Sequence, residues 1–135
     1  MKKLSIGFTV FAALCLASVN ATAKELVKEF KGSGNQTTTE FVVKAPWIAD
    51  WRVTGDYPGQ MAVAINLMAS PGGEYLGKIA VTKYVDNGVK LFDEGGTYRF
   101  QINSSLANWT IRVVELTRQE AETYTPHEAG KIRMD

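Results

Sequence analysis

The sequence predicts an all-β protein, a single antiparallel β-sandwich or jelly roll of about eight strands. Apolar and polar residues alternate with a period of two through most of the chain after residue 24, which is the pattern of half-buried strands. Short glycine-rich turn signals separate the alternating runs, and no stretch of helical periodicity lies between them. Short strands joined by tight turns are typical of antiparallel sandwiches.

Residues 47–53 form the clearest of the predicted strands. The odd positions are apolar, whereas Asp50 and Arg52 stand between them, so Trp47 and Trp51 are predicted to lie on one face. A proline at position 46 favours an extended chain here. The other predicted strands are residues 26–30, 41–43, 61–68, 79–85, 89–92, 98–103 and 109–114.

Turn residues separate these strands. Tight turns are predicted at S-P-G-G (70–73), D-N-G (86–88) and D-E-G-G (93–96), and longer connections at 54–59 and 103–108. Asn87-Gly88, between Tyr84 and Leu91, is the dipeptide typical of a two-residue hairpin.

The first 23 residues have the composition of a signal peptide. Two lysines precede an apolar run at 4–19, and Ala21 and Ala23 fit a signal peptidase site, so we expect cleavage after Ala23. This leaves a β-sandwich domain at 24–117 and a polar tail at 118–135, expected to be mobile, with a short helix at 117–124 as the alternative. No later segment approaches the roughly 20 apolar residues of a membrane span. We expect a periplasmic or secreted protein.

Composition narrows the chemistry. Without the first 23 residues the chain has no cysteine and has 13 basic and 14 acidic residues, a net charge of −1. Near-neutral charge without a basic run indicates neither a nucleic-acid nor a polybasic membrane footprint. His127 is the only histidine and lies in the predicted tail, which argues against a serine triad and a zinc site. We therefore expect a protein that is not an enzyme.

Calcium is the one cofactor for which the predicted turns contain candidate ligands. Hard cations take oxygen ligands from acidic loops. The predicted turns carry six such residues: Asp56, Glu74, Asp86, Asn87, Asp93 and Glu94. No D-x-D-x-D-G spacing concentrates them, and Asp and Asn in turns usually serve backbone geometry. We expect no cofactor and no metal, with calcium as the alternative.

Aromatic residues supply the candidate binding site. Burying one tryptophan contributes on the order of 5 kcal/mol, so Trp51 and Trp109 are predicted to belong to the core. Trp47 follows a proline at the edge of its strand and is the candidate for an exposed platform, together with Tyr57 and Tyr75. The loops at 54–59 and 70–75 would then form one binding end.

Residues 95–116, G-G-T-Y-R-F-Q-I-N-S-S-L-A-N-W-T-I-R-V-V-E-L, carry a resemblance. The stretch resembles the closing hairpin of small secreted bacterial β-sandwich modules of the pre-peptidase C-terminal type. In those modules a G-T-Y turn enters one strand and a second alternating strand ends the domain. The resemblance implies a non-catalytic accessory or binding module and assigns no site residues.

Three functions are compatible with these observations. The main hypothesis is an exported, non-catalytic module that binds a cell-envelope component, a glycan or another exported protein. The second is a periplasmic inhibitor or immunity-type protein that blocks a hydrolase with one loop. The third is a small hydrolase using a carboxylate pair drawn from Asp50, Asp93, Glu94 and Glu115. The sequence leaves the oligomeric state open.

Overall fold

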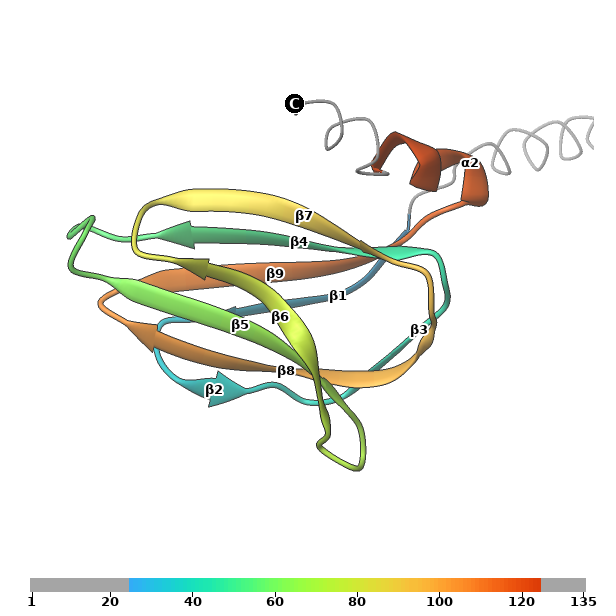
Figure 1. The fold of residues 1–135 in the computed structure, drawn as a ribbon, viewed down its shortest axis with the longest axis horizontal. Coiled ribbons are helices and arrows are strands. Elements are labelled where there is room, and N and C mark those ends of the chain that lie inside the picture. Colours follow the sequence, from blue (N-terminus) through green and yellow to red (C-terminus); the bar gives the residue numbers. More distant parts are fainter. Residues whose placement is uncertain (1–24, 125–135) are drawn as a thin grey trace, which may run out of the picture.

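The computed structural model describes residues 25–124, which form two antiparallel sheets packed face to face (Figure 1). One sheet has the strand order β1-β9-β4-β7 and the other β2-β8-β5-β6, with β3 also pairing with β8. The predicted all-β sandwich is confirmed. The strands are β1 (Glu25–Gly32), β2 (Gln36–Thr37), β3 (Phe41–Val43), β4 (Trp47–Thr54), β5 (Ala62–Ala69), β6 (Tyr75–Thr82), β7 (Asp86–Phe92), β8 (Gly96–Ser105) and β9 (Asn108–Glu115).

Most connections cross from one sheet to the other. Among consecutive described strands, only β5 and β6 pair with each other. Strands β8 and β9 lie in different sheets, so the predicted closing hairpin at 95–116 is not a paired hairpin. The predicted longer connection at 103–108 is also wrong, because only Leu106 and Ala107 separate the two strands.

The core lies between the sheets and follows the predicted alternation. On β4, Trp47, Ala49 and Val53 are buried in it, and Trp51 packs against it from the same face. The opposite face of β4 places Ile48 in a second, smaller cluster with Leu116 and Ala121. One strand therefore carries the main core on one side and a helix contact on the other.

The predicted hairpin at Asn87-Gly88 is wrong, because both residues lie inside β7. Asn87 pairs with Arg52 and Gly88 pairs with Trp51, while the chain changes sheets earlier, at 83–85. The glycine has a packing role there. A Cβ at position 88 would lie 2.7 Å from Cζ2 of Trp51, so only glycine leaves room for the indole.

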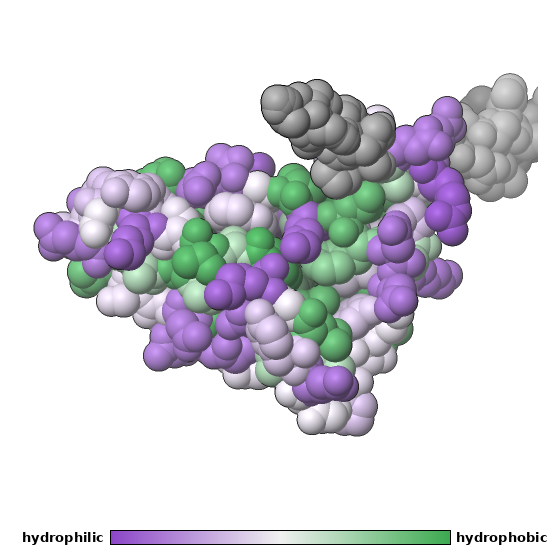
Figure 2. All heavy atoms as spheres, viewed as in Figure 1, coloured by the Kyte–Doolittle hydropathy of each residue, from purple (hydrophilic) through white to green (hydrophobic). Residues whose placement is uncertain are grey.

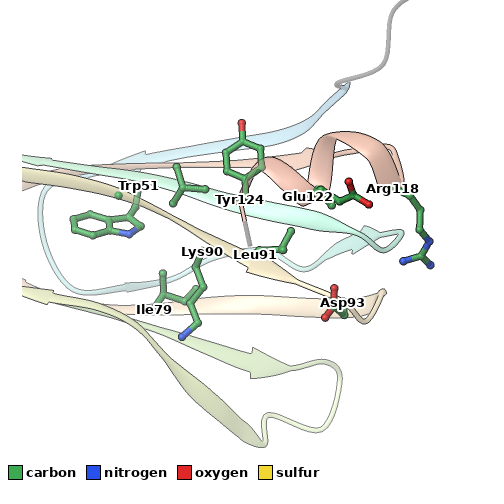
Figure 3. A pocket seen from close by; sticks show the side chains of 11 residues that line it. Trp51, Ile79, Lys90, Leu91, Asp93, Arg118, Glu122 and Tyr124 are labelled. Atoms are coloured by element: carbon green, nitrogen blue, oxygen red, sulfur yellow. The ribbon is translucent and has the colours of Figure 1, made fainter. Parts of the chain in front are cut away.

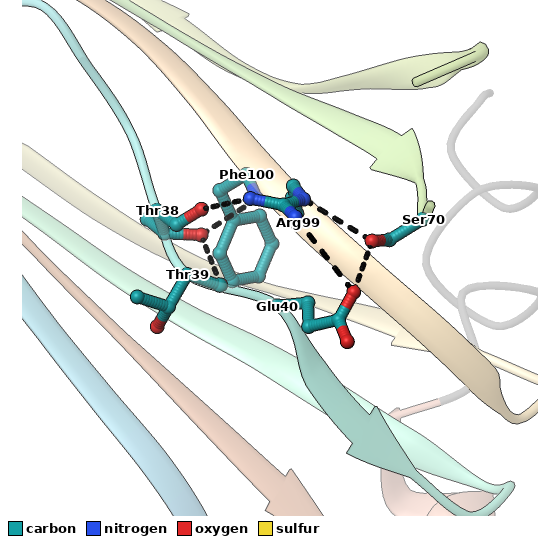
Figure 4. Close-up of polar contacts among 6 residues, drawn as sticks. All are labelled: Thr38, Thr39, Glu40, Ser70, Arg99 and Phe100. Atoms are coloured by element: carbon teal, nitrogen blue, oxygen red, sulfur yellow. Dashed lines mark hydrogen bonds and ion pairs between the residues drawn. The ribbon is translucent and has the colours of Figure 1, made fainter. Parts of the chain in front are cut away.

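Residues 36–43 form an interrupted strand along β8. Between β2 and β3, the buried Thr38 donates its backbone N–H to the Phe100 carbonyl (2.9 Å), and its hydroxyl accepts from the Phe100 N–H (3.0 Å). Arg99 fastens the same segment: it donates to the Thr38 carbonyl (3.3 Å) and the Ser70 hydroxyl (3.1 Å) and pairs with Glu40 at 3.8 Å (Figure 4). Arg99 thereby ties the interrupted strand to the β5–β6 turn.

A short helical segment follows the last strand. Helix α2 (Arg118–Ala121) continues into the 3₁₀ turn η1 (Glu122–Tyr124), as the helix alternative for 117–124 predicted. Thr117 and Glu120 form a capping box at its start. The predicted signal peptide and the rest of the predicted tail, with His127, lie outside the described residues. Within residues 25–124, no helix has the length and apolar character that crossing a membrane requires.

Candidate functional site

Trp47 does not form the predicted exposed platform. Its side chain is 0% exposed, stacks on Phe92 with ring centroids 4.3 Å apart, and donates from Nε1 to the Glu94 carbonyl at 2.9 Å. Phe41 covers a further side of the ring, with centroids 5.8 Å apart. The prediction is wrong because the 93–95 turn folds over what looks in the sequence like a strand edge.

Tyr57 and Tyr75 are exposed, but they do not share one site. Their exposed fractions are 55% and 57%. Tyr57 lies in the loop before β5 and Tyr75 begins β6 after the turn that follows β5, so the eight residues of β5 separate them by about 26 Å. The predicted binding end formed by the loops at 54–59 and 70–75 is therefore wrong.

Other exposed apolar residues lie on loops at the same end of the sandwich as Tyr57. Three loops meet at the end of the sandwich where β4, β6 and β8 finish: residues 55–61, 83–85 and 106–107 (Figure 1). They carry exposed large apolar side chains, which we call the loop-end ridge: Tyr57, Tyr84, Val85 and Leu106. Each is between 55% and 59% exposed.

The backbones under the loop-end ridge are held in place. Gly59 donates to the Lys83 carbonyl at 2.8 Å, joining the first two loops. The buried hydroxyl of Thr82 accepts from the Tyr84 N–H at 3.1 Å. Met61, which is 0% exposed, anchors the end of the first loop in the core. The exposed side chains are thus presented by fixed loops.

Leu106 stands at the tip of the β8–β9 connection in an uncommon backbone conformation. Its φ is 59°, the only positive φ of a residue other than glycine among residues 25–124. The next residue, Ala107, is buried, and its carbonyl accepts from the Ser104 hydroxyl at 3.1 Å. The left-handed conformation turns the chain between sheets and leaves the leucine side chain outside.

A groove runs along the edge strand β7, from Trp51 and Ile79 to α2. Its volume is about 720 Å³. Its lining consists of Trp51, Ile79, Gly88, Val89, Lys90, Leu91, Asp93, Arg118, Ala121, Glu122 and Tyr124. Figure 3 shows Trp51, Ile79 and Lys90 at one end and Asp93 and Arg118 at the other. On this side of the molecule, hydrophobic side chains gather along β7 beside α2, with hydrophilic ones around them (Figure 2).

The three tryptophans differ in what their indole N–H groups contact. Trp47 donates to Glu94 and Trp109 donates to the Gly34 carbonyl at 3.1 Å. Trp51 is half-buried and lines the groove, and its Nε1 has no hydrogen-bond partner in the part of the chain that the structure describes. The sequence predicted Trp51 in the core and Trp47 as exposed; in the structure Trp47 is fully buried, and Trp51 is half-buried and packs against the core.

Acidic side chains do not assemble into an obvious metal site. Between residues 25 and 124, no group of three or more His, Cys, Asp or Glu side chains is placed to hold a metal ion. Tyr98 has a raised pKa because burial, and then the nearby charge of Glu94, disfavour its ionised form. Its hydroxyl donates to the Glu94 carbonyl at 2.9 Å, so this group holds the turn in place.

The sequence contains a local signal for part of the loop-end ridge but none for the groove along β7. Leu106 is an isolated leucine in the polar stretch N-S-S-L-A-N, which is an exposed apolar signal. The exposure of Tyr84 and Val85 was not predicted, because the alternating pattern assigned both residues to the strand at 79–85, whereas β6 ends at Thr82. The groove has no local signal, because Trp51, Ile79 and Arg118 meet only through strand pairing and packing.

Fold and site together define a β-sandwich with two separate candidate binding surfaces. Comparison with known proteins finds no family model and no curated protein that matches the chain. Among solved structures, the chain is similar to the crystal structure of Aeromonas hydrophila PliG, a periplasmic lysozyme inhibitor of g-type lysozyme. The two chains are 14% identical, the match covers 73% of this chain and 90% of that one, and the TM-score is 0.38.

Proposed function

We propose that the chain is an exported, non-catalytic binding module that docks onto a protein partner through the loop-end ridge. The observation that supports this most is the grouping of four exposed apolar side chains on three loops whose backbones are fixed. Clustered exposed apolar residues mark interaction surfaces, and tyrosine is enriched in them.

The shape of the ridge favours a concave partner. Its four exposed residues lie on the loops at one end of the sandwich, and loops at the end of a sandwich can enter a cleft. Enzyme active sites are among the most pronounced clefts on exported proteins. We therefore propose that the partner is an exported hydrolase whose cleft the ridge occupies, as in the inhibitor hypothesis.

Fixed loops also reduce the cost of binding. A loop that must become ordered on association loses conformational entropy, at about 0.5 to 1.5 kcal/mol for each immobilised side chain. Here the hydrogen bonds of Gly59 and Thr82 already hold the loops. The buried Met61 and Ala107 anchor them from below. This organisation supports tight binding by a small surface.

The test uses three tyrosines of nearly equal exposure. Binding of the purified protein to a panel of cell-wall hydrolases, lysozymes included, is measured by calorimetry together with residual hydrolase activity. For a hydrolase that is bound, Tyr57→Ala and Tyr84→Ala are expected to weaken binding by about 30-fold or more, the effect of an interface hot spot.

Tyr75→Ala is the matched control. This tyrosine is 57% exposed but lies at the other end of β5, so its loss should change the affinity less than about 2-fold. An equal loss in all three variants, or inhibition that survives both ridge variants, contradicts the docking surface. A panel in which no hydrolase is bound contradicts the proposed partner.

A further inference from the structure

We propose that the groove along β7 binds a neutral oligosaccharide, with Trp51 as the stacking platform. This second site is independent of the loop-end ridge and of the protein partner proposed for it. The ligand class follows from three features of the groove: a free indole N–H, a ring held in place, and a balanced set of charges.

The free N–H is the first feature. Buried tryptophan N–H groups usually find a hydrogen-bond partner. Trp47 and Trp109 do so within the protein, whereas Nε1 of Trp51 has no partner among the described residues. A ligand hydroxyl in the groove can accept this hydrogen bond.

The second feature is that the backbone of β7 holds one side of the ring. The backbone of Gly88 lies against the indole, since a Cβ there would be 2.7 Å from Cζ2 and 3.0 Å from Nε1. On the facing sheet, β6 has a bulge next to Ala80, which leaves Ile79 unpaired. Such a bulge re-aims a side chain, and here Ile79 packs against the core and lines the groove.

Charge supplies the third feature. The groove contains two cations, Lys90 and Arg118, and two anions, Asp93 and Glu122, all exposed. None of the four forms a salt bridge with another described residue. The four charges sum to zero, so no net charge of the groove favours an ionic ligand, and its lining offers both hydrogen-bond donors and acceptors. Sugar hydroxyls both donate and accept, and the apolar face of a sugar ring stacks on an indole.

The same groove does not suit an added β-strand. Strand β7 is an edge of its sheet, and an extended peptide could pair with a free edge. Lys90 pairs with Ala49 and so faces the inside of the sandwich, from where its amine reaches the Lys78 carbonyl on β6 at 3.4 Å. An inward-pointing charge on an edge strand opposes strand addition.

The test measures binding of chito- and cello-oligosaccharides to the purified protein, by calorimetry and by tryptophan fluorescence with iodide quenching. We expect one iodide-accessible tryptophan, protected by the bound oligosaccharide. Trp51→Phe keeps an aromatic ring but removes the N–H, and should weaken binding by about 2- to 13-fold, the effect of one hydrogen bond. It should also abolish the fluorescence change.

Lys90→Met removes a charge from the groove at an exposed position and keeps a side chain of similar length. It should weaken oligosaccharide binding with an unchanged melting temperature, while Tyr84→Ala should leave this binding unchanged. The proposal is overturned if neither oligosaccharide series binds, if Trp51→Phe binds as well as the wild type, or if only polyanionic glycans or extended peptides bind. Failure of hydrolase binding, by contrast, bears only on the loop-end ridge.

Discussion

At the scale of single residues, Leu106 stands out because its conformation costs stability. A left-handed backbone brings Cβ close to the following carbonyl oxygen, at roughly 1 to 2 kcal/mol for a residue other than glycine. Glycine, asparagine or aspartate would make the same turn with less strain. The chain instead carries a leucine whose side chain is 56% exposed. The contact with a protein partner that we propose for the loop-end ridge would account for a strained residue that gains little burial.

Replacing Leu106 by glycine should therefore separate stability from binding. We expect Leu106→Gly to leave the free energy of unfolding unchanged or raise it by up to about 1 kcal/mol, because relief of strain offsets the greater freedom of the unfolded chain. The same variant should lose hydrolase binding. Urea unfolding and calorimetry are the measurements.

Leu76→Gly is the control for this pair of effects. Leu76 lies inside β6, is 46% exposed and has no left-handed conformation to relieve. Glycine in a strand should there lower stability by about 0.5 to 1 kcal/mol. If Leu106→Gly destabilises the protein as much as Leu76→Gly does, the strain argument is wrong.

The raised pKa of Tyr98 predicts that the free energy of unfolding depends on pH in the alkaline range. Its folded-state pKa is raised above the ordinary value of 10.0 by burial and then by Glu94. A raised pKa favours the neutral hydroxyl in the folded state, so the stabilisation is complete below pH 10.0 and is lost as the pH rises through the folded value. The free-energy gap between the wild type and Tyr98→Phe should narrow above pH 10.0. Parallel curves in urea unfolding would contradict this.

The tryptophans show how far residue-level prediction reaches. The alternation on β4 correctly places Trp47 and Trp51 on one face of the strand. Which ring is covered depends on Phe41, Phe92 and the 93–95 turn, all distant in sequence. A periodic pattern identifies the face of a residue, whereas its exposure depends on the segments that fold over that face.

At the scale of elements, β7 combines an edge, a groove wall and a glycine whose role is packing. Asn87-Gly88 resembles a hairpin turn in sequence, but both residues lie inside β7. The indole of Trp51 occupies the space that a side chain at position 88 would need. The preference of Asn-Gly for turns is a local property, and it carries no information about Trp51, which lies on a different strand. This is why the turn prediction failed while those at 70–73 and 93–96 agree with the structure.

Gly88→Ala tests this account of β7. A Cβ that must displace the indole of Trp51 should lower the free energy of unfolding by about 1 to 3 kcal/mol, the usual cost of overpacking. Gly72→Ala is the control, since nothing lies within 4 Å of its Cβ position and its φ is not positive. A Gly88→Ala protein as stable as the wild type would show that the indole has room to move.

At the scale of the whole molecule, the class of fold was predictable and the arrangement of its strands was not. Alternation and turns predict about eight strands, against nine in the described residues, and miss the two-residue β2. They do not indicate that β8 and β9 belong to different sheets, because face-to-face sheets and paired hairpins impose the same period of two. The two proposed binding surfaces depend on this arrangement: one lies on the loops that cross between the sheets, and the other lies along the edge strand β7.

The place of β9 has a consequence for how the protein is made. This strand is the last of the described strands in sequence, yet it sits between β1 and β4 in the middle of its sheet. A nascent chain that still lacks β9 has no neighbour for β1 and no inner partner for β4. Contacts between such distant segments also form slowly. Because residues 25–107 contain only three of the four strands of this sheet, we expect a chain cut after residue 107 to stay unfolded until β9 is supplied.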